Sequence, residues 1–118
     1  MYKRTHNCGE IRSSNIGNSV ILNGWGNKVR LHGQIIFIDL RDRYGKTQIV
    51  FDADEYKGDF EKIKKLSMED VLSIRGVVRA RVESAKNPNL ATGQIEVLVS
   101  KYLMLNESAP LPFMLNDR

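Results

Sequence analysis

Residues 35–51 read IIFIDLRDRYGKTQIVF, and this stretch decides the fold. Its first half alternates with a period of two, which is typical of a strand with one buried face. One face of residues 35–41 carries Ile36, Ile38 and Leu40, and the other carries Phe37, Asp39 and Arg41. Turn-forming residues follow at 42–45, after which Ile49 and Phe51 point one way and Gln48 points the opposite way. The stretch therefore predicts a β-hairpin.

Three more strands and one helix are expected around this hairpin. Period-two patterns over 20–30, 71–82 and 94–105 predict the strands, and glycines on both sides of Trp25 allow the first strand to bend sharply. Apolar residues spaced three apart predict a short helix over 55–66, with Asp54 as its cap. The residues expected to face inward on the last two strands are Leu72, Ile74, Val78, Ala80, Val82, Ile95, Val97 and Val99. Five strands with a helix between the third and the fourth is the order of the all-β OB-fold, a five-stranded Greek-key barrel.

Composition limits the chain to one small domain. Its 118 residues are 42% hydrophobic and 27% charged, which is apolar enough to form one compact core. No apolar stretch approaches the roughly 18 residues that span a bilayer, and no secretory signal is visible. The single cysteine, Cys8, excludes an internal disulfide and fits a reducing compartment, so we expect a cytoplasmic protein.

The folded domain is expected to cover residues 1–107. The sequence Ser108-Ala109-Pro110-Leu111-Pro112 stops regular structure, because each proline fixes its own φ and restricts the residue before it. Residues 113–115 are apolar and have no evident packing partner. We therefore interpret 108–118 as the start of a linker, and the chain as a fragment of a longer protein.

Known catalytic motifs are absent from the sequence. His6 and Cys8 lie two positions apart, but no further ligand has a matching spacing, so a packed thiol near an imidazole is the simpler interpretation. Asp52 and Asp54 are likewise explained by turn and helix-cap chemistry better than by a metal pair. We expect neither a catalytic residue nor a metal site.

Positive charge is clustered along the chain. There are 18 Lys and Arg against 14 Asp and Glu, which gives a net charge of +4. Arg79 and Arg81 lie two apart on the outer face of one strand, where they could clamp phosphates or stack on bases, or could simply be solvated. Arg30 adds a third cation from the end of the first strand. Clustered cations of this kind favour a nucleic-acid partner.

Other residues of the same outer face suit base recognition. Phe37 is an aromatic ring among polar neighbours, so it could be a platform for a base or could pack under a helix or a loop. The Gln48 amide can donate and accept at once, as reading a base edge requires, although alone it is an ordinary surface residue. Glu96 would repel phosphate, but it could accept hydrogen bonds from guanine N1 and N2 or pair with a nearby arginine. Their shared face predicts a surface that binds nucleic acid.

Five ordered motifs resemble the N-terminal anticodon-binding domain of bacterial-type aspartyl-tRNA synthetase, a class II enzyme. They are Gly24-Trp25 with Arg30, FIDLRDRYG at 37–45, QIVF at 48–51, GVVRAR at 76–81 and ATGQIEV at 91–97. Residues 4–9 and Leu111-Pro112-Phe113 fit as well, so the resemblance covers nearly the whole chain.

The resemblance implies a role for each residue of the outer face. Phe37 would stack on the central uracil of the anticodon, and Gln48 would read that base. Glu96 would read the guanine-type first base, while Arg30, Arg79 and Arg81 would hold the anticodon loop. ATP and magnesium would belong to a catalytic domain outside this chain, toward which the linker at 108–118 would lead. The chain itself should therefore need no cofactor and catalyse nothing, whereas the whole protein would be an ATP-dependent aspartate–tRNA ligase.

Some positions depart from the family pattern. Lys28 and Val29 replace the usual arginines before Arg30, which weakens the expected contribution of that strand. His32 stands where many members specific for tRNA-Asp carry leucine, and Ser84 stands where some of them carry lysine. Family members with histidine at this place often also accept the asparagine anticodon, which ends in uracil instead of cytosine. The resemblance therefore implies that His32 relaxes discrimination at the third anticodon base, so that tRNA-Asn is a partner beside tRNA-Asp. The alternative is that His32 is a solvated loop residue.

A second class of function is also open to this sequence. A stand-alone OB-fold protein would bind any unstructured single-stranded nucleic acid with comparable affinity, whereas an anticodon module would prefer the intact loop. The resemblance further implies a homodimer for the whole synthetase, held mainly by its catalytic domain. We therefore expect this chain to be largely monomeric and to have no membrane partner.

Overall fold

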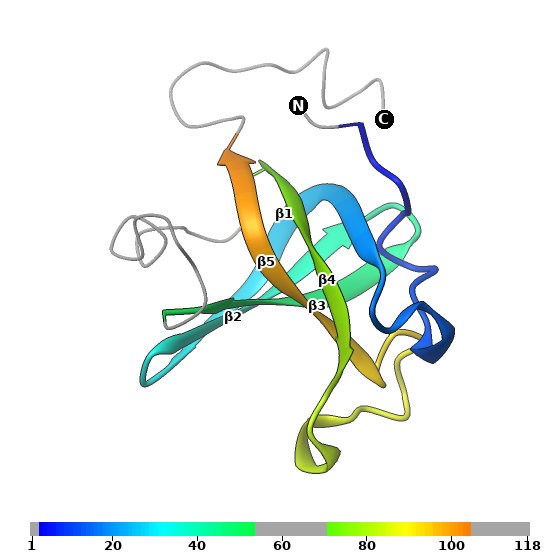
Figure 1. Cartoon of the computed structure of the whole chain (residues 1–118), viewed down its shortest axis with the longest axis vertical. Coiled ribbons are helices and arrows are strands. Elements are labelled where there is room, and N and C mark those ends of the chain that lie inside the picture. Colours follow the sequence, from blue (N-terminus) through cyan, green and yellow to red (C-terminus); the bar gives the residue numbers. More distant parts are fainter. Residues whose placement is uncertain (1–2, 54–70, 105–118) are drawn as a thin grey trace.

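The computed structural model describes residues 3–53 and 71–104, which form a closed five-stranded barrel (Figure 1). The elements are η1 (Ser13–Asn15), β1 (Ser19–His32), β2 (Ile35–Asp42), β3 (Gly45–Asp52), β4 (Val71–Ala80), η2 (Glu83–Ala85) and β5 (Ile95–Met104). The strand order around the barrel is β1-β2-β3-β5-β4, and every pair is antiparallel except β3 with β5. This topology confirms the predicted OB-fold. The expected helix over 55–66 and the expected linker over 108–118 lie outside the described residues.

β1 is long enough to pair with two neighbours. Its first half, through Trp25, pairs with β4, and its second half, from Trp25 onward, pairs with β2. The register with β2 shifts between Gly26 and Lys28, so the strand bends where the sequence predicts. At Gly24 an added Cβ would collide with the Arg41 carbonyl, so this close approach requires glycine. The bend brings the second half of β1 alongside β2.

The hairpin of β2 and β3 is fixed by the carboxylate of Asp42. One oxygen accepts hydrogen bonds from the backbone N–H groups of Tyr44 at 2.8 Å and Gly45 at 3.2 Å. The other oxygen accepts from the backbone N–H of Cys8 at 2.8 Å, which ties the N-terminal segment to the turn. Gly45 has a φ of 155°, which a side chain would disfavour. The turn therefore sets the register in which β2 faces β3.

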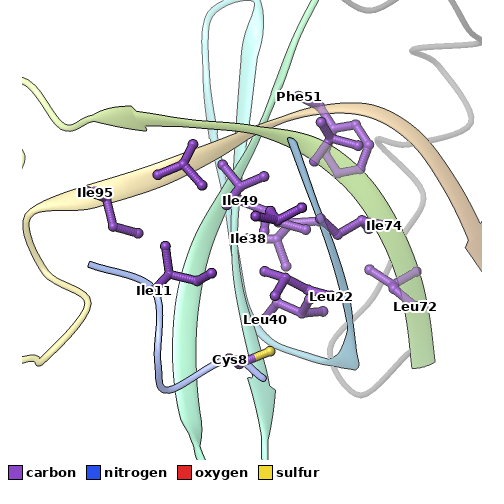
Figure 2. Packing of buried hydrophobic residues seen from close by; sticks show 14 of the residues in the cluster. Cys8, Ile11, Leu22, Ile38, Leu40, Ile49, Phe51, Leu72, Ile74 and Ile95 are labelled. Carbon is purple, nitrogen blue, oxygen red and sulfur yellow. The ribbon is translucent and has the colours of Figure 1, made fainter. Parts of the chain in front are cut away.

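Apolar side chains from every strand fill the barrel, and Ile11 and Cys8 close it from the N-terminal segment (Figure 2). The predicted inward-facing residues that are buried are Ile36, Ile38, Leu40, Ile49, Phe51, Leu72, Ile74, Val78, Ile95, Val97 and Val99. The prediction is wrong for Ala80 and Val82, which are exposed, the latter to 70%. β4 ends at Ala80 and the chain leaves the barrel there, so neither side chain has a core to enter. Within the described ranges, no helix has the length and apolarity that a membrane span requires.

Candidate nucleic-acid interface

Strand pairing brings the predicted site residues together on the outside of the barrel. Across β1 and β2, Arg30 lies opposite Phe37. Across β4 and β5, Arg79 lies opposite Glu96. Gln48 joins the two groups, because β3 pairs with β2 on one side and with β5 on the other. All five strands therefore meet in one surface, which the alternation in the sequence predicts only strand by strand.

Hydrogen bonds link these side chains into one network, here called the outer-face cluster and made up of Arg30, Asp39, Gln48, Arg79 and Glu96. The Arg30 guanidinium donates to Gln48 Oε1 at 3.0 Å, and Gln48 Nε2 donates to Glu96 Oε1 at 2.8 Å. The second oxygen of Glu96 accepts from Arg79 Nε at 2.7 Å. Arg30 also lies 3.4 Å from Asp39 Oδ1. The cluster holds two guanidinium groups and two carboxylates, so its formal charges cancel.

The centre of the cluster is buried, whereas its edges are open. Gln48 and Glu96 are 5% and 6% exposed, while the side chains of Arg30 and Arg79 keep 34% and 39% of their surface. Every buried side-chain nitrogen and oxygen among the described residues has a hydrogen-bond partner. Buried polar groups held from several sides keep a fixed orientation, which a surface that reads bases requires.

Arg81 extends the cluster but uses its donors differently from Arg79. It is 8% exposed; its Nε donates to the Ile95 carbonyl at 2.8 Å and its Nη1 to the Ala85 carbonyl at 3.2 Å. Burial lowers the pKa of Arg81, and the nearby carboxylates of Asp39 and Glu96 oppose that shift. Arg81 therefore braces the segment around η2. The prediction that it also contacts phosphate stays a prediction.

Phe37 lies outside the barrel core, next to the cluster. Its ring is half-buried, and the ring of His32 meets it edge-on, with centroids 5.7 Å apart and an interplanar angle of 78°. His32 itself is exposed. Phe37 is therefore not a core residue, and its ring and the imidazole form the end of the surface that lies beside Arg30. The alternative that Phe37 packs under the expected helix is not tested, because residues 54–70 lie outside the described part of the chain.

Asp39 is the member of the cluster that sequence reasoning does not single out as a site residue. The alternation already places it on the same face as Phe37, and the turn at Asp42 fixes it opposite Gln48. An acidic side chain is easily overlooked on a surface expected to bind phosphate. The sequence feature that could have identified Asp39 is its position in the hairpin opposite Gln48. There its carboxylate lies within reach of Arg30.

The structure gives no support to a catalytic or metal-binding use of Cys8 and His6. The Cys8 thiol is fully buried, and both this burial and the nearby Asp42 raise its pKa far above the ordinary value, so the thiol stays protonated. His6 Nδ1 lies 2.7 Å from the hydroxyl of Thr5. In the part of the chain that is described, no three His, Cys, Asp or Glu side chains gather as metal ligands would.

Known proteins are similar to this chain along nearly its whole length. Residues 20–105 match the family model described as the OB-fold nucleic acid binding domain of the tRNA anti-codon type. An aspartate–tRNA(Asp/Asn) ligase of Corynebacterium glutamicum strain R is 52% identical over 97% of this chain, and one of Geotalea uraniireducens strain Rf4 is 47% identical over 98%. These matches cover 18% and 20% of the two relatives, so the chain spans about a fifth of their length.

Solved structures show the same barrel. Asparaginyl-tRNA synthetase from Pyrococcus horikoshii, complexed with asparaginyl-adenylate, superposes with a TM-score of 0.74 at 29% identity, over 98% of this chain and 25% of that one. An OBody bound to hen egg-white lysozyme, AM2EP06, superposes with a TM-score of 0.76 at 26% identity, over 92% of this chain and 98% of that one.

Proposed function

Because the chain belongs to the family of OB-fold nucleic acid binding domains of the tRNA anti-codon type, we propose that it is the anticodon-binding module of an aspartate–tRNA ligase. The observation that carries this proposal is the outer-face cluster, in which a buried amide and a buried carboxylate are held beside a half-buried ring. The names of the bacterial relatives support the amino acid and the tRNA.

Each side chain has a distinct task in this proposal. Phe37 stacks on the central uracil of the anticodon, while Gln48 reads its edge with the donor and acceptor positions that the cluster leaves open. Glu96 accepts hydrogen bonds from the N1 and N2 donors of the guanine in first position. The exposed edges of Arg30 and Arg79 hold the phosphates of the loop, with Arg81 behind them.

We also propose that His32 broadens recognition at the third anticodon base, so that tRNA-Asn is bound beside tRNA-Asp. Support comes from its place against Phe37 and from the names of the relatives, which include both tRNAs. The test compares two stem-loops that differ only in cytosine or uracil at the third base. His32→Leu is expected to increase the preference for cytosine, and an unchanged ratio of the two dissociation constants would overturn this part of the proposal.

The whole protein would then be an ATP-dependent ligase whose ATP, magnesium and aspartate sites lie in another domain, and it would act as a homodimer in the cytoplasm. This chain would bind the anticodon without catalysing aminoacylation, and it would be largely monomeric. Sedimentation of the purified chain and an aminoacylation assay test these statements. Stable dimers, or charging of tRNA by the chain alone, would contradict them.

A competition titration tests the main proposal against sequence-independent binding. A labelled stem-loop with the aspartate anticodon is displaced by unlabelled stem-loops with altered first or second bases, and by an unstructured oligonucleotide of equal length. The proposal expects guanine and uracil in the first two positions to be preferred, with binding that weakens steeply as salt rises. Equal competition by every RNA would instead identify a general single-strand binder.

A further inference from the structure

Gln48 and Glu96 lie in direct contact although their roles in base recognition are assigned separately. We propose that Gln48 is also the positioning residue for Glu96, so that the first and second anticodon bases are recognised as a coupled pair. This inference rests on the proposed function, since it concerns how the same surface discriminates bases. It adds a thermodynamic coupling that independent reading of each base would lack.

The cluster allows only one orientation of the Gln48 amide. In that orientation Oε1 accepts from Arg30 at 3.0 Å and Nε2 donates to Glu96 at 2.8 Å. A half-turn of the amide would place its oxygen against the carboxylate and its NH₂ against the guanidinium. Both contacts would then become repulsive, and Gln48, at 5% exposure, has little water to compensate them. Arg30 therefore fixes which edge of the amide faces Glu96.

The carboxylate of Glu96 is oriented by this amide on one side and by Arg79 on the other. Its two oxygens accept from different donors, Oε1 from Gln48 and Oε2 from Arg79 Nε at 2.7 Å. Each oxygen keeps further lone-pair capacity, so guanine N1–H and N2–H can be accepted while these bonds persist. Without the Gln48 donor, the carboxylate would be free to rotate toward Arg79 and would lose the alignment that guanine requires.

A uracil bound by Gln48 should therefore improve recognition of guanine by Glu96. The amide N–H that faces the carboxylate and the groups that face uracil belong to the same rigid plane. A uracil that is hydrogen-bonded to this amide plane restricts the remaining motion of the plane. In addition, hydrogen bonds linked in series in a buried site strengthen one another. The preference for guanine should be larger when the second base is uracil than when it is cytosine.

The wild-type chain provides the first test, which needs no variant. Four anticodon stem-loops combine guanine or inosine in first position with uracil or cytosine in second position, inosine lacking only the N2 amino group. With uracil present, guanine is expected to bind about tenfold more tightly than inosine, as loss of a hydrogen bond to a charged acceptor implies. With cytosine present, the ratio should fall at least threefold. Additive effects of the two bases would overturn the inference.

Gln48→Met provides the second test, because methionine keeps the length of the side chain but neither donates to Glu96 nor accepts from Arg30. The variant should lose its preference for uracil and reduce its preference for guanine over inosine to about twofold, which corresponds to loss of most of that hydrogen bond. The preference at the third base should not change. Gln94→Met, the same substitution at an exposed position just before β5, serves as the control and should keep every preference.

The outcomes separate the inference from the proposed function. If Gln48→Met loses the uracil preference but keeps the full guanine preference, the coupling is refuted and the anticodon module stands. If all three positions lose discrimination together, the variant is loosened in general, and the positioning role is refuted as well. If the wild-type chain prefers neither guanine nor uracil, the proposed function fails, and the inference fails with it.

Discussion

Phe37→Ala removes the ring that the proposed function places under the central anticodon base. The ring is half-buried and His32 contacts it in a T-shaped arrangement, so part of the ring stays open to a base. One base stacked on an aromatic side chain contributes about 1–3 kcal/mol. The substitution should therefore raise the dissociation constant of the aspartate-anticodon stem-loop by about 5- to 150-fold.

Titration of a fluorescent stem-loop against wild type and variant measures this change. Because the variant also loses the edge contact with His32, worth about 0.5–1.5 kcal/mol of stability, urea unfolding must first show that it is folded at the assay temperature. Leu103→Ala, which truncates a partly exposed apolar side chain seven residues beyond Glu96 on β5, is the control and should leave binding unchanged. On a stem-loop with an abasic central position, wild type and Phe37→Ala should bind alike. A dissociation constant within twofold of wild type on the intact stem-loop would refute the stacking role.

Three further predictions concern the cluster, the hairpin and the buried thiol. Arg79→Ala should weaken binding of every anticodon sequence and reduce the slope of log affinity against log salt by about 1, and equal slopes would contradict a phosphate contact. Asp42→Ala should lower the free energy of unfolding by about 1–3 kcal/mol in urea titrations, because it leaves the Cys8 N–H without its acceptor; a loss as small as that of the exposed control Glu83→Ala would contradict this. Cys8 should react with iodoacetamide far more slowly in the folded chain than in urea, and equal rates would show that the thiol is accessible. Since folding raises the pKa of this thiol above its ordinary value of 9.0, stability due to the protonated thiol is complete below that pH and is lost as the pH rises beyond it.

The barrel is predictable from the sequence because the alternation of apolar and polar residues within each strand indicates which face of that strand is buried. Alternation over 35–41 and at 48–51 is a local property, so the faces of β2 and β3 follow without knowledge of the rest of the chain. The residue at which a strand leaves the core, in contrast, is not determined by the local sequence. Ala80 and Val82 continue the alternation of β4, but pairing with β5 ends at Ala80 opposite Ile95, and that contact joins segments far apart in sequence.

The sequence predicts which residues belong to the site, but not the contacts between them. Side-chain parity places Gln48, Arg79 and Glu96 on the outer face, but parity carries no information about which of them touch. The bond between Gln48 and Glu96 spans 48 positions and depends on the parallel pairing of β3 with β5. The burial of Arg81 depends in the same way on carbonyls of Ala85 and Ile95, which only the folded chain brings to its guanidinium.

The internal pairing of the outer-face cluster has a consequence for selectivity. An uncompensated group of arginines would attract every RNA through its phosphates, and affinity gained in that way carries no sequence information. Here the charges of Arg30 and Arg79 are balanced by Asp39 and Glu96, and the further cation Arg81 is only 8% exposed, so non-specific attraction at the centre of the surface is reduced. Some RNA bases cannot form hydrogen bonds with the remaining donor and acceptor positions of Gln48 and Glu96. Such an RNA excludes water from these two polar groups without a new hydrogen bond in exchange, which costs binding free energy. A base with the right donors and acceptors avoids that cost, which makes discrimination depend on the bases more than on the backbone.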